Sequence, residues 1–140
     1  MIIRHTSDIE CVNWVQLAAV FERAPLGTRE PGILEALFRN SQVRCFVYAG
    51  EEIVGAGRAL TDWHSWSIFF DVVLLPEYQG RGHGRSIMNS LEVQAGTRHF
   101  MLHSVPGREG FYQGLGYRSM ATAMAKYQDP EKAAELGYIK

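Results

Sequence analysis

A stretch near the middle of the chain combines glycine with cationic side chains in a pattern suited to binding phosphate. It follows an apolar run that ends at Pro76 and precedes a segment with apolar residues at helical spacing. Glycine lacks Cβ and tolerates positive φ, so such a loop lets backbone N–H groups approach a ligand closely. The free N–H groups that open the following helix would add donors, and arginines would add charge. The residues are Gln79, Gly80, Arg81, Gly82, His83, Gly84 and Arg85.

Two common nucleotide-binding motifs do not fit this loop. In the dinucleotide motif Gly-x-Gly-x-x-Gly, the third glycine would fall on Ile87, or on Arg85 when counted from Gly80. The triphosphate motif needs Gly-Lys-Ser or Gly-Lys-Thr, which the chain does not contain. The loop therefore matches neither of the two standard glycine motifs.

The loop resembles the acetyl-CoA loop of the GCN5-related N-acetyltransferase (GNAT) family, whose pattern is Gln/Arg-x-x-Gly-x-Gly/Ala after a strand. Residues 79–84 have this pattern, and residues 111–117, Phe-Tyr-Gln-Gly-Leu-Gly-Tyr, are similar to a second family motif, Phe-Tyr-x-x-Leu-Gly-Phe. The resemblance implies an α/β (α+β) fold with a mixed, mostly antiparallel sheet flanked by helices. It also implies acetyl-CoA as cosubstrate and an enzyme that transfers its acetyl group to an amine.

The resemblance further implies roles for residues on either side of the loop. In the family, the residues just before the loop pair with the pantetheine arm, here Val72, Val73 and Leu74, and the Leu74 N–H would lie nearest the thioester carbonyl. Tyr112 stands where the family has a tyrosine that contacts the cofactor and protonates the leaving thiolate. A phenol of pKa ~10 can protonate a thiolate of pKa ~8.5 when the two are held close. Packing alone is the alternative role for Tyr112.

Asp71 is an ionisable residue inside an otherwise apolar run. An unpaired buried charge costs several kcal/mol, so Asp71 needs a partner, water or a function. It could bind an ammonium substrate and accept its proton, directly or through water. The alternative is a structural ion pair with Arg58, and a bulge in this strand could turn Asp71 away from the substrate.

Four further residues are candidates for an acceptor pocket, although packing is an alternative for each of them: Phe21, Asp62, Trp63 and Trp66. A carboxylate and aromatic rings suit an ammonium on an apolar body. We therefore expect a small aralkyl or alkyl amine to be preferred over anionic amino acids, for which no cationic partner is clearly reserved. Acetylation of protein lysines or N-termini, and a non-catalytic acetyl-CoA-binding regulator, are the alternative functions.

The composition limits the remaining possibilities. The 140 residues fit one domain, residues 1–140, and a net charge of −1 without a long basic run argues against a nucleic-acid partner. No apolar run is long enough to span a membrane, and the first residues do not have the charged start and apolar region of a secretory signal, so we expect a cytoplasmic protein. Cys11 and Cys45 are expected to be buried thiols, and five scattered histidines predict no metal site. A monomer or a homodimer is expected.

Apolar periodicity and turn residues predict the elements that position these residues. The chain should begin with a strand over residues 1–4 and a helix capped by Thr6 or Ser7 that ends near Glu22. The later elements are a helix from Pro31, a hairpin over residues 43–49 and 53–60, a central strand over 68–75, a helix after the glycine loop that Gly96 caps, a parallel strand over 100–105, a helix over 107–115, a strand over 117–127, and a helix that starts at Asp129-Pro130 and ends at Gly137.

Overall fold

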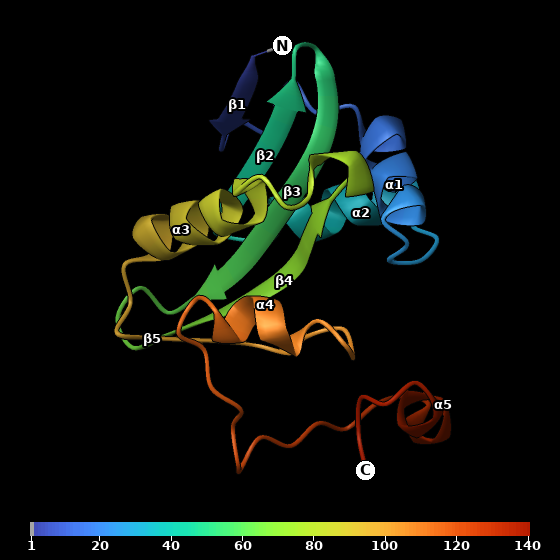
Figure 1. Cartoon of the computed structure of the whole chain (residues 1–140), viewed down its shortest axis with the longest axis vertical. Helices are drawn as coiled ribbons and strands as arrows, with labels where there is room; N and C mark the ends of the chain where they lie inside the picture. The colour runs from blue at the N-terminus through green and yellow to red at the C-terminus, as the bar shows by residue number, and fades with distance from the viewer. Residues whose placement is uncertain (1) are drawn as a thin grey trace. The chain divides into compact units, whose positions relative to one another are not determined.

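The computed structural model describes residues 2–140, so the Met1 position of the predicted first strand lies outside the described residues. The chain divides into two compact units, Met1–Leu102 and His103–Lys140, and each is described by itself. The larger unit contains a five-stranded sheet and three α-helices (Figure 1). The assignment of all 140 residues to a single domain stays a prediction.

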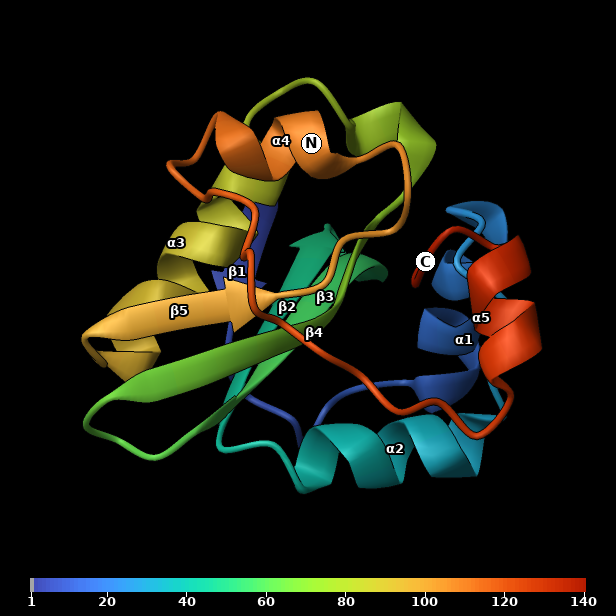
Figure 2. The ribbon, with the colours of Figure 1, turned by 90° about the horizontal axis from the view of Figure 1, so that it is seen from below.

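The sheet has the strand order β1-β2-β3-β4-β5. Each of the first three strands is antiparallel to the next, whereas β5 runs parallel to β4 (Figure 2). This confirms the predicted mixed, mostly antiparallel sheet. The strands are β1 (Ile3–Thr6), β2 (Val43–Ala49), β3 (Glu52–Thr61), β4 (Trp66–Leu74) and β5 (His99–Leu102).

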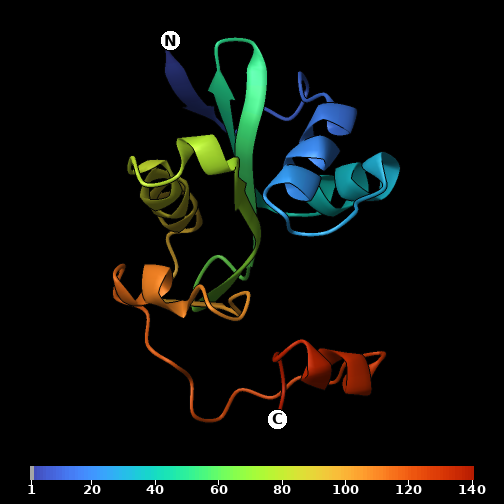
Figure 3. The same ribbon diagram turned by 45° about the vertical axis from the view of Figure 1, so that its right-hand side comes forward.

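Helices cover both faces of the sheet. Helices α1 (Trp14–Arg23) and α2 (Pro31–Arg39) lie on one face and α3 (His83–Ala95) lies on the other (Figure 3). Fully buried aromatic rings fill the space under α1 and α2, including Phe21 and Phe38. On the α3 face, Gly57 of β3 lies so close to the helix that a Cβ there would come within 2.9 Å of the Ile87 side chain. Glycine at this position therefore sets how closely α3 packs on the sheet.

The first helix begins later than predicted, at Trp14 instead of after Thr6 or Ser7. Thr6 Oγ1 and Asp8 Oδ1 accept N–H groups two residues further along, which holds the intervening chain in turns. Asn13 then caps α1 by accepting the Gln16 N–H. The prediction of a buried, helical Cys11 was consequently wrong, because Cys11 lies exposed in this loop, whereas Cys45 is buried in β2.

The second unit has two short helices joined by an irregular segment (Figure 2). Helix α4 (Glu109–Gln113) lies in the predicted range, and α5 (Pro130–Glu135) begins after Asp129, whose side chain accepts the Lys132 N–H. The predicted strand over residues 117–127 is wrong, since this segment forms no strand and most of its side chains are exposed. The segment contains three alanines, which are weak strand formers, and a sequence pattern alone does not supply a neighbouring strand.

Candidate functional site

The central strand β4 is irregular near its C-terminal end. Arg58 of β3 pairs with Phe70 but Ala56 pairs with Val73, so Gly57 alone stands opposite two residues of β4, Asp71 and Val72. This is the arrangement of a β-bulge, and Asp71 has the positive φ of 56°. Asp tolerates this backbone conformation better than most residues. The bulge predicted as an alternative for this strand is therefore present at Asp71.

The pairing of β4 with β5 ends at Phe69 and Leu102, before the bulge. Within residues 2–140, the rest of β4 has no neighbouring strand on the β5 side. The predicted pantetheine-binding residues Val72, Val73 and Leu74 lie in this part of β4. An extended ligand could add to such an edge by pairing with backbone groups, as a further strand would.

The predicted phosphate loop follows β4 through a short 3₁₀ helix, η1 (Pro76–Tyr78). Gln79 Nε2 donates to Leu74 O at 2.9 Å, which ties the start of the loop to the end of the strand. Gly80 and Gly82 have φ of 77° and 88°, and a Cβ at either position would meet no atom within 4 Å. Glycine is required at these positions by the backbone conformation, and the space beside the loop is open.

The loop leads directly into α3, of which Gly82 is the N-cap. The first intrahelical bond of this turn runs from Ser86 N to Gly82 O at 3.1 Å. The N–H groups of His83, Gly84 and Arg85 precede that bond and have no acceptor in the helix. Arg81 and Arg85 are exposed nearby. The loop thus presents backbone donors, a helix N-terminus and two cations together, which suits a phosphate group.

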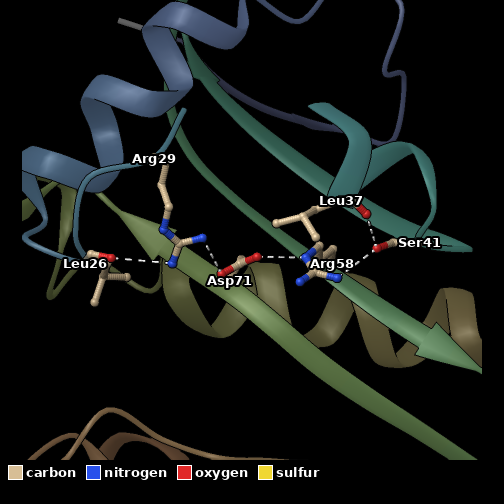
Figure 4. Close-up of polar contacts among 6 residues, drawn as sticks. All are labelled: Leu26, Arg29, Leu37, Ser41, Arg58 and Asp71. Carbon is tan, nitrogen blue, oxygen red and sulfur yellow. Dashed lines mark hydrogen bonds and ion pairs between the residues drawn. The ribbon is translucent and has the colours of Figure 1, made fainter. Parts of the chain in front are cut away.

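The Asp71 carboxylate joins two arginines on the α1–α2 face of the sheet (Figure 4). Arg29 Nη1 donates to Asp71 Oδ1 at 3.0 Å, and Arg58 Nε donates to Asp71 Oδ2 at 2.8 Å. Arg58 Nη1 also donates to Ser41 Oγ at 3.2 Å, and Ser41 Oγ donates to Leu37 O at 2.7 Å. The alternative that the sequence left open, an ion pair of Asp71 with Arg58, is therefore present.

Arg29 is a residue that the sequence analysis missed. It lies in the loop between α1 and α2, with its guanidinium carbon 4.4 Å from the centre of the Phe21 ring. Arg29 and Asp71 are 42 positions apart, and no motif or periodicity links them. Its position could be found only once the sheet and the two helices had been assembled.

The predicted acceptor residues do not all lie together. Phe21 is fully buried under Arg29 and so belongs to the Asp71 cluster. Asp62 and Trp63 lie in the turn between β3 and β4, and Trp66 begins β4, about 26 Å along the strand from Leu74 at ~3.3 Å per residue. The structure therefore does not bring these three residues to the Asp71 end of β4.

The Asp62 carboxylate has a local role in its loop. Its Oδ1 accepts the N–H groups of His64, Ser65 and Trp66 at 2.8, 2.7 and 3.1 Å. These hydrogen bonds, that of His64 first, lower the pKa of Asp62. The indole of Trp66 lies 4.8 Å from the His99 ring, whereas Trp63 is largely exposed. Asp62 thus stabilises the β3–β4 turn.

Tyr112 lies on α4 in the second unit. Its ring contacts the rings of Phe111 and Tyr117, at centroid distances of 4.9 and 6.1 Å. Its carbonyl accepts the N–H groups of Leu115 and Tyr117, both at 3.0 Å. Burial raises the pKa of Tyr112, and the charge of Arg108 opposes this. The phenol is therefore protonated at neutral pH, as a proton donor must be.

Among residues 2–140, no three His, Cys, Asp or Glu side chains are grouped so that they could hold a metal ion. The described helices also include none that is both long and apolar enough to cross a bilayer.

Comparison with known proteins identifies the fold. A protein of unknown function from Staphylococcus aureus, a probable acetyltransferase, superposes with a TM-score of 0.79 at 18% identity, over 91% of this chain and 99% of its own. The ribosomal-protein-S18-alanine N-acetyltransferase of Escherichia coli gives 0.72 at 12% identity, over 86% and 80%. Glucosamine-6-phosphate N-acetyltransferase of Arabidopsis thaliana gives 0.66 at 14% identity, over 92% and 100%.

The sequence itself gives a more specific result. No curated protein sequence matches the chain. Residues 41–119, more than half of the chain, match the model of the acetyltransferase (GNAT) domain. This range includes β2 to β4, the glycine loop, α3 and both of the motifs on which the resemblance rested. The chain therefore belongs to the GNAT family of acetyltransferases.

Proposed function

We propose that this protein binds acetyl-CoA at the loop between β4 and α3 and transfers its acetyl group to the primary amine of a small alkyl or aralkyl compound. The observation that carries the proposal is the geometry of residues 79–85. Two glycines with positive φ leave open space, and the N–H groups of His83, Gly84 and Arg85 have no acceptor in α3. These residues fit a pyrophosphate, with Arg81 and Arg85 supplying positive charge.

The unpaired edge of β4 supports a matching position for the pantetheine arm. Val72, Val73 and Leu74 follow the last residue of β4 that pairs with β5. Their backbone groups would hold an extended arm by strand-like hydrogen bonds. When bound, acetyl-CoA supplies an activated thioester, and the Leu74 N–H would donate to the thioester carbonyl oxygen as negative charge develops on it.

Acetyl transfer to the amine also requires proton transfers, for which Tyr112 and Asp71 are the candidate residues. The neutral amine nitrogen would form a bond to the carbonyl carbon as the carbon–sulfur bond breaks, and the departing sulfur would take a proton from the Tyr112 hydroxyl. The nitrogen would lose one proton as it becomes an amide nitrogen, and this proton balances the one that Tyr112 must regain. The proton lost by the ammonium goes to Asp71 or to water. Each Asp71 oxygen accepts one hydrogen bond from an arginine, and each keeps a second lone pair that could accept the proton of the amine.

The fold alone does not identify the acceptor substrate. The similar Escherichia coli enzyme acts on a ribosomal protein, and the Arabidopsis enzyme on a sugar phosphate. We propose a small molecule, with cytoplasmic location, a monomeric or homodimeric state and no nucleic-acid partner as accompanying predictions. A non-catalytic acetyl-CoA sensor would not need a proton donor, so the presence of Tyr112 in the family motif supports an enzyme.

The test measures ligand binding first and turnover second. At ~100 times its dissociation constant, acetyl-CoA should add about 2.7 kcal/mol to the free energy of unfolding, seen as a raised melting temperature. A panel of alkyl and aralkyl amines, with a lysine-containing peptide as comparison, should then give acetylated amine and free CoA. An unchanged melting temperature at saturating acetyl-CoA would refute the cofactor site. Acetylation of the peptide alone would refute the small-molecule acceptor.

A further inference from the structure

The Asp71 cluster carries more positive than negative charge. Arg58 and Asp71 have side chains that are 11% and 12% exposed, and they neutralise each other as a well-paired buried ion pair. Arg29 is then a surplus cation, and its side chain is 27% exposed. The nearest acidic neighbour in sequence, Glu30, directs its carboxylate to the N–H groups of Gly32 and Ile33 at the start of α2. Among residues 2–140, Arg29 forms an ion pair with Asp71 and with no second carboxylate.

Arg29 is also held in a fixed orientation. Its guanidinium packs on the buried Phe21 ring and donates to Asp71 and, at 3.4 Å, to Leu26 O. A guanidinium has five N–H donors, so part of its donor set remains for a ligand. The entropy cost of ordering the long side chain has already been met by packing. A pre-oriented, partly exposed guanidinium of this kind suits a carboxylate or phosphate, which it can bind through two parallel hydrogen bonds.

The cluster lies at the end of β4 where the reaction is proposed to occur. Asp71 precedes Leu74 by three residues, about 10 Å along a regular strand and less across a bulge. Arg29 reaches Asp71 from the α1–α2 loop, as Figure 4 shows. An acceptor amine beside Leu74 could therefore extend its body toward this loop and place a second group near Arg29.

We propose that Arg29 determines acceptor specificity by binding an anionic group, a carboxylate or a phosphate, carried by the acceptor amine. The inference rests on the proposed acetyl transfer and sharpens its substrate class. It reverses the sequence-based expectation that amines without an acid group are preferred, because that expectation depended on the lack of a cationic partner. Asp71 is, on this proposal, a positioning residue that holds Arg29 through its Oδ1.

The test uses pairs of amines that differ only in the acid group, with acetyl-CoA at saturation. Phenylalanine is compared with phenethylamine for the carboxylate, and phosphoethanolamine with ethanolamine for the phosphate. In the wild type, the acidic member of at least one pair should have the higher kcat/KM, and the preferred pair tells carboxylate from phosphate. Arg29→Gln should reduce that preference about 10- to 100-fold, mainly through KM of the acceptor. Arg29→Lys should restore part of it, and Arg29→Glu should invert it.

Arg23→Gln is the matched control. Arg23 also borders the α1–α2 loop, is about half exposed, and forms an ion pair with Glu77 instead of Asp71. This variant should keep the wild-type preference. The inference is overturned if the wild type prefers the plain amines, if Arg29→Gln reduces both members of a pair equally, or if its effect falls on KM of acetyl-CoA.

A binding measurement separates this inference from the proposed function. The CoA-saturated protein is titrated with N-acetylphenylalanine and with N-acetylphenethylamine, and the dissociation constants are measured calorimetrically. Tighter binding of the acid that depends on Arg29, without turnover of any amine, would refute acetyl transfer and leave the anion site standing. Turnover of amines, with equal binding of both ligands in the wild type and in Arg29→Gln, would support the enzyme and refute the anion site.

Discussion

The two sides of the C-terminal end of β4 are built in different ways. On the loop side, residues 79–85 present backbone N–H groups, and both positive-φ glycines face open space. On the α1–α2 side, the structure depends on side chains, with Asp71 bonded to Arg29 and Arg58. The backbone N–H donors of the loop are proposed to bind the pyrophosphate of the cofactor, which is the same in every reaction cycle. Side chains can differ from one family member to the next, so they are suited to selecting the acceptor.

The two sides also differ in how far apart their parts lie along the chain. The loop is one continuous segment, closed by the Gln79 hydrogen bond to Leu74. The acceptor side joins residues separated by 42 and 13 positions. A substitution in the loop should therefore act on the cofactor alone. A substitution in the cluster should alter stability and acceptor kinetics together.

The largest effect is expected for Gly82→Asp. It adds a side chain and a negative charge where the pyrophosphate is proposed to bind, and it should abolish the increase in melting temperature given by acetyl-CoA. Gly50→Asp is a matched control, since Gly50 also has positive φ, 61°, and also has no atom within 4 Å of an added Cβ. Gly50 lies in the turn between β2 and β3. Both variants carry backbone strain, and only Gly82→Asp should lose the ligand response.

A Gly82→Asp protein that acetyl-CoA stabilises as strongly as it does the wild type would show that the cofactor does not bind at this loop. Equal loss of the response in Gly50→Asp would instead attribute the effect to general destabilisation. Isothermal titration calorimetry with CoA distinguishes these outcomes, because it measures the dissociation constant without heating the protein.

Tyr112→Phe should give the second largest effect. It removes the hydroxyl but keeps the ring that contacts Phe111 and Tyr117. The chemical step should slow about 10²-fold, the usual scale for loss of a general acid, while the dissociation constant of acetyl-CoA stays close to that of the wild type. Single-turnover kinetics measures the chemical step directly. Tyr117→Phe, in the same motif, is the control and should keep the wild-type rate.

The Tyr112→Phe variant also tests whether Tyr112 contributes to the pH dependence of kcat. Burial raises the pKa of Tyr112, so its proton is lost only at a pH above the ordinary pKa of a phenol, ~10. An alkaline fall in kcat caused by Tyr112 should therefore lie above that pH and be absent from Tyr112→Phe. An unchanged single-turnover rate in Tyr112→Phe would remove the residue from the acid role and leave it a packing function.

The sequence predicted the loop side well because its determinants are local. The glycines, the apolar run before them and the amphipathic segment after them are neighbours in the sequence, and each by itself favours one backbone conformation. The helix end at Gly96 was predicted for the same reason, since a glycine with φ 63° there donates its N–H to Glu92 O. Local rules of backbone conformation act in the same way in any fold.

The acceptor side could be predicted only in part because its contacts are tertiary. The ionisable residue in an apolar strand pointed to a partner, and Arg58 could be named because hairpin register places it near Asp71. Arg29 could not be named, since the course of the seven-residue loop between α1 and α2 depends on how the two helices pack. Asp62 and Trp66 are close to Asp71 in sequence, but the extended backbone of β4 places them far from Asp71 in space. The prediction of a strand over residues 117–127 failed for a related reason, because a strand needs a neighbouring strand that no local sequence pattern supplies.

The smallest effect is expected for Asp71→Asn, and it distinguishes between the possible roles of this carboxylate. Asn tolerates positive φ as Asp does, so the bulge should persist and only the charge is lost. Arg58 would remain largely buried without its counter-charge, which should lower the free energy of unfolding by about 2 kcal/mol, measured by urea denaturation. KM for the acceptor amine should rise, with little change in the affinity for acetyl-CoA.

Asp62→Asn provides the matched control, because Asp62 is the other carboxylate bordering β4 and its Oδ1 bonds only backbone N–H groups of its own turn. An Asn Oδ1 can accept these same hydrogen bonds, so acceptor kinetics should not change. If Asp71 takes the proton of the amine, Asp71→Asn should also flatten the acidic limb of the pH–rate profile. If Asp71 only positions Arg29, that limb should persist while the preference for acidic acceptors weakens. Amine kinetics that are the same in Asp71→Asn and the wild type would contradict both roles and leave this carboxylate a structural partner of Arg58.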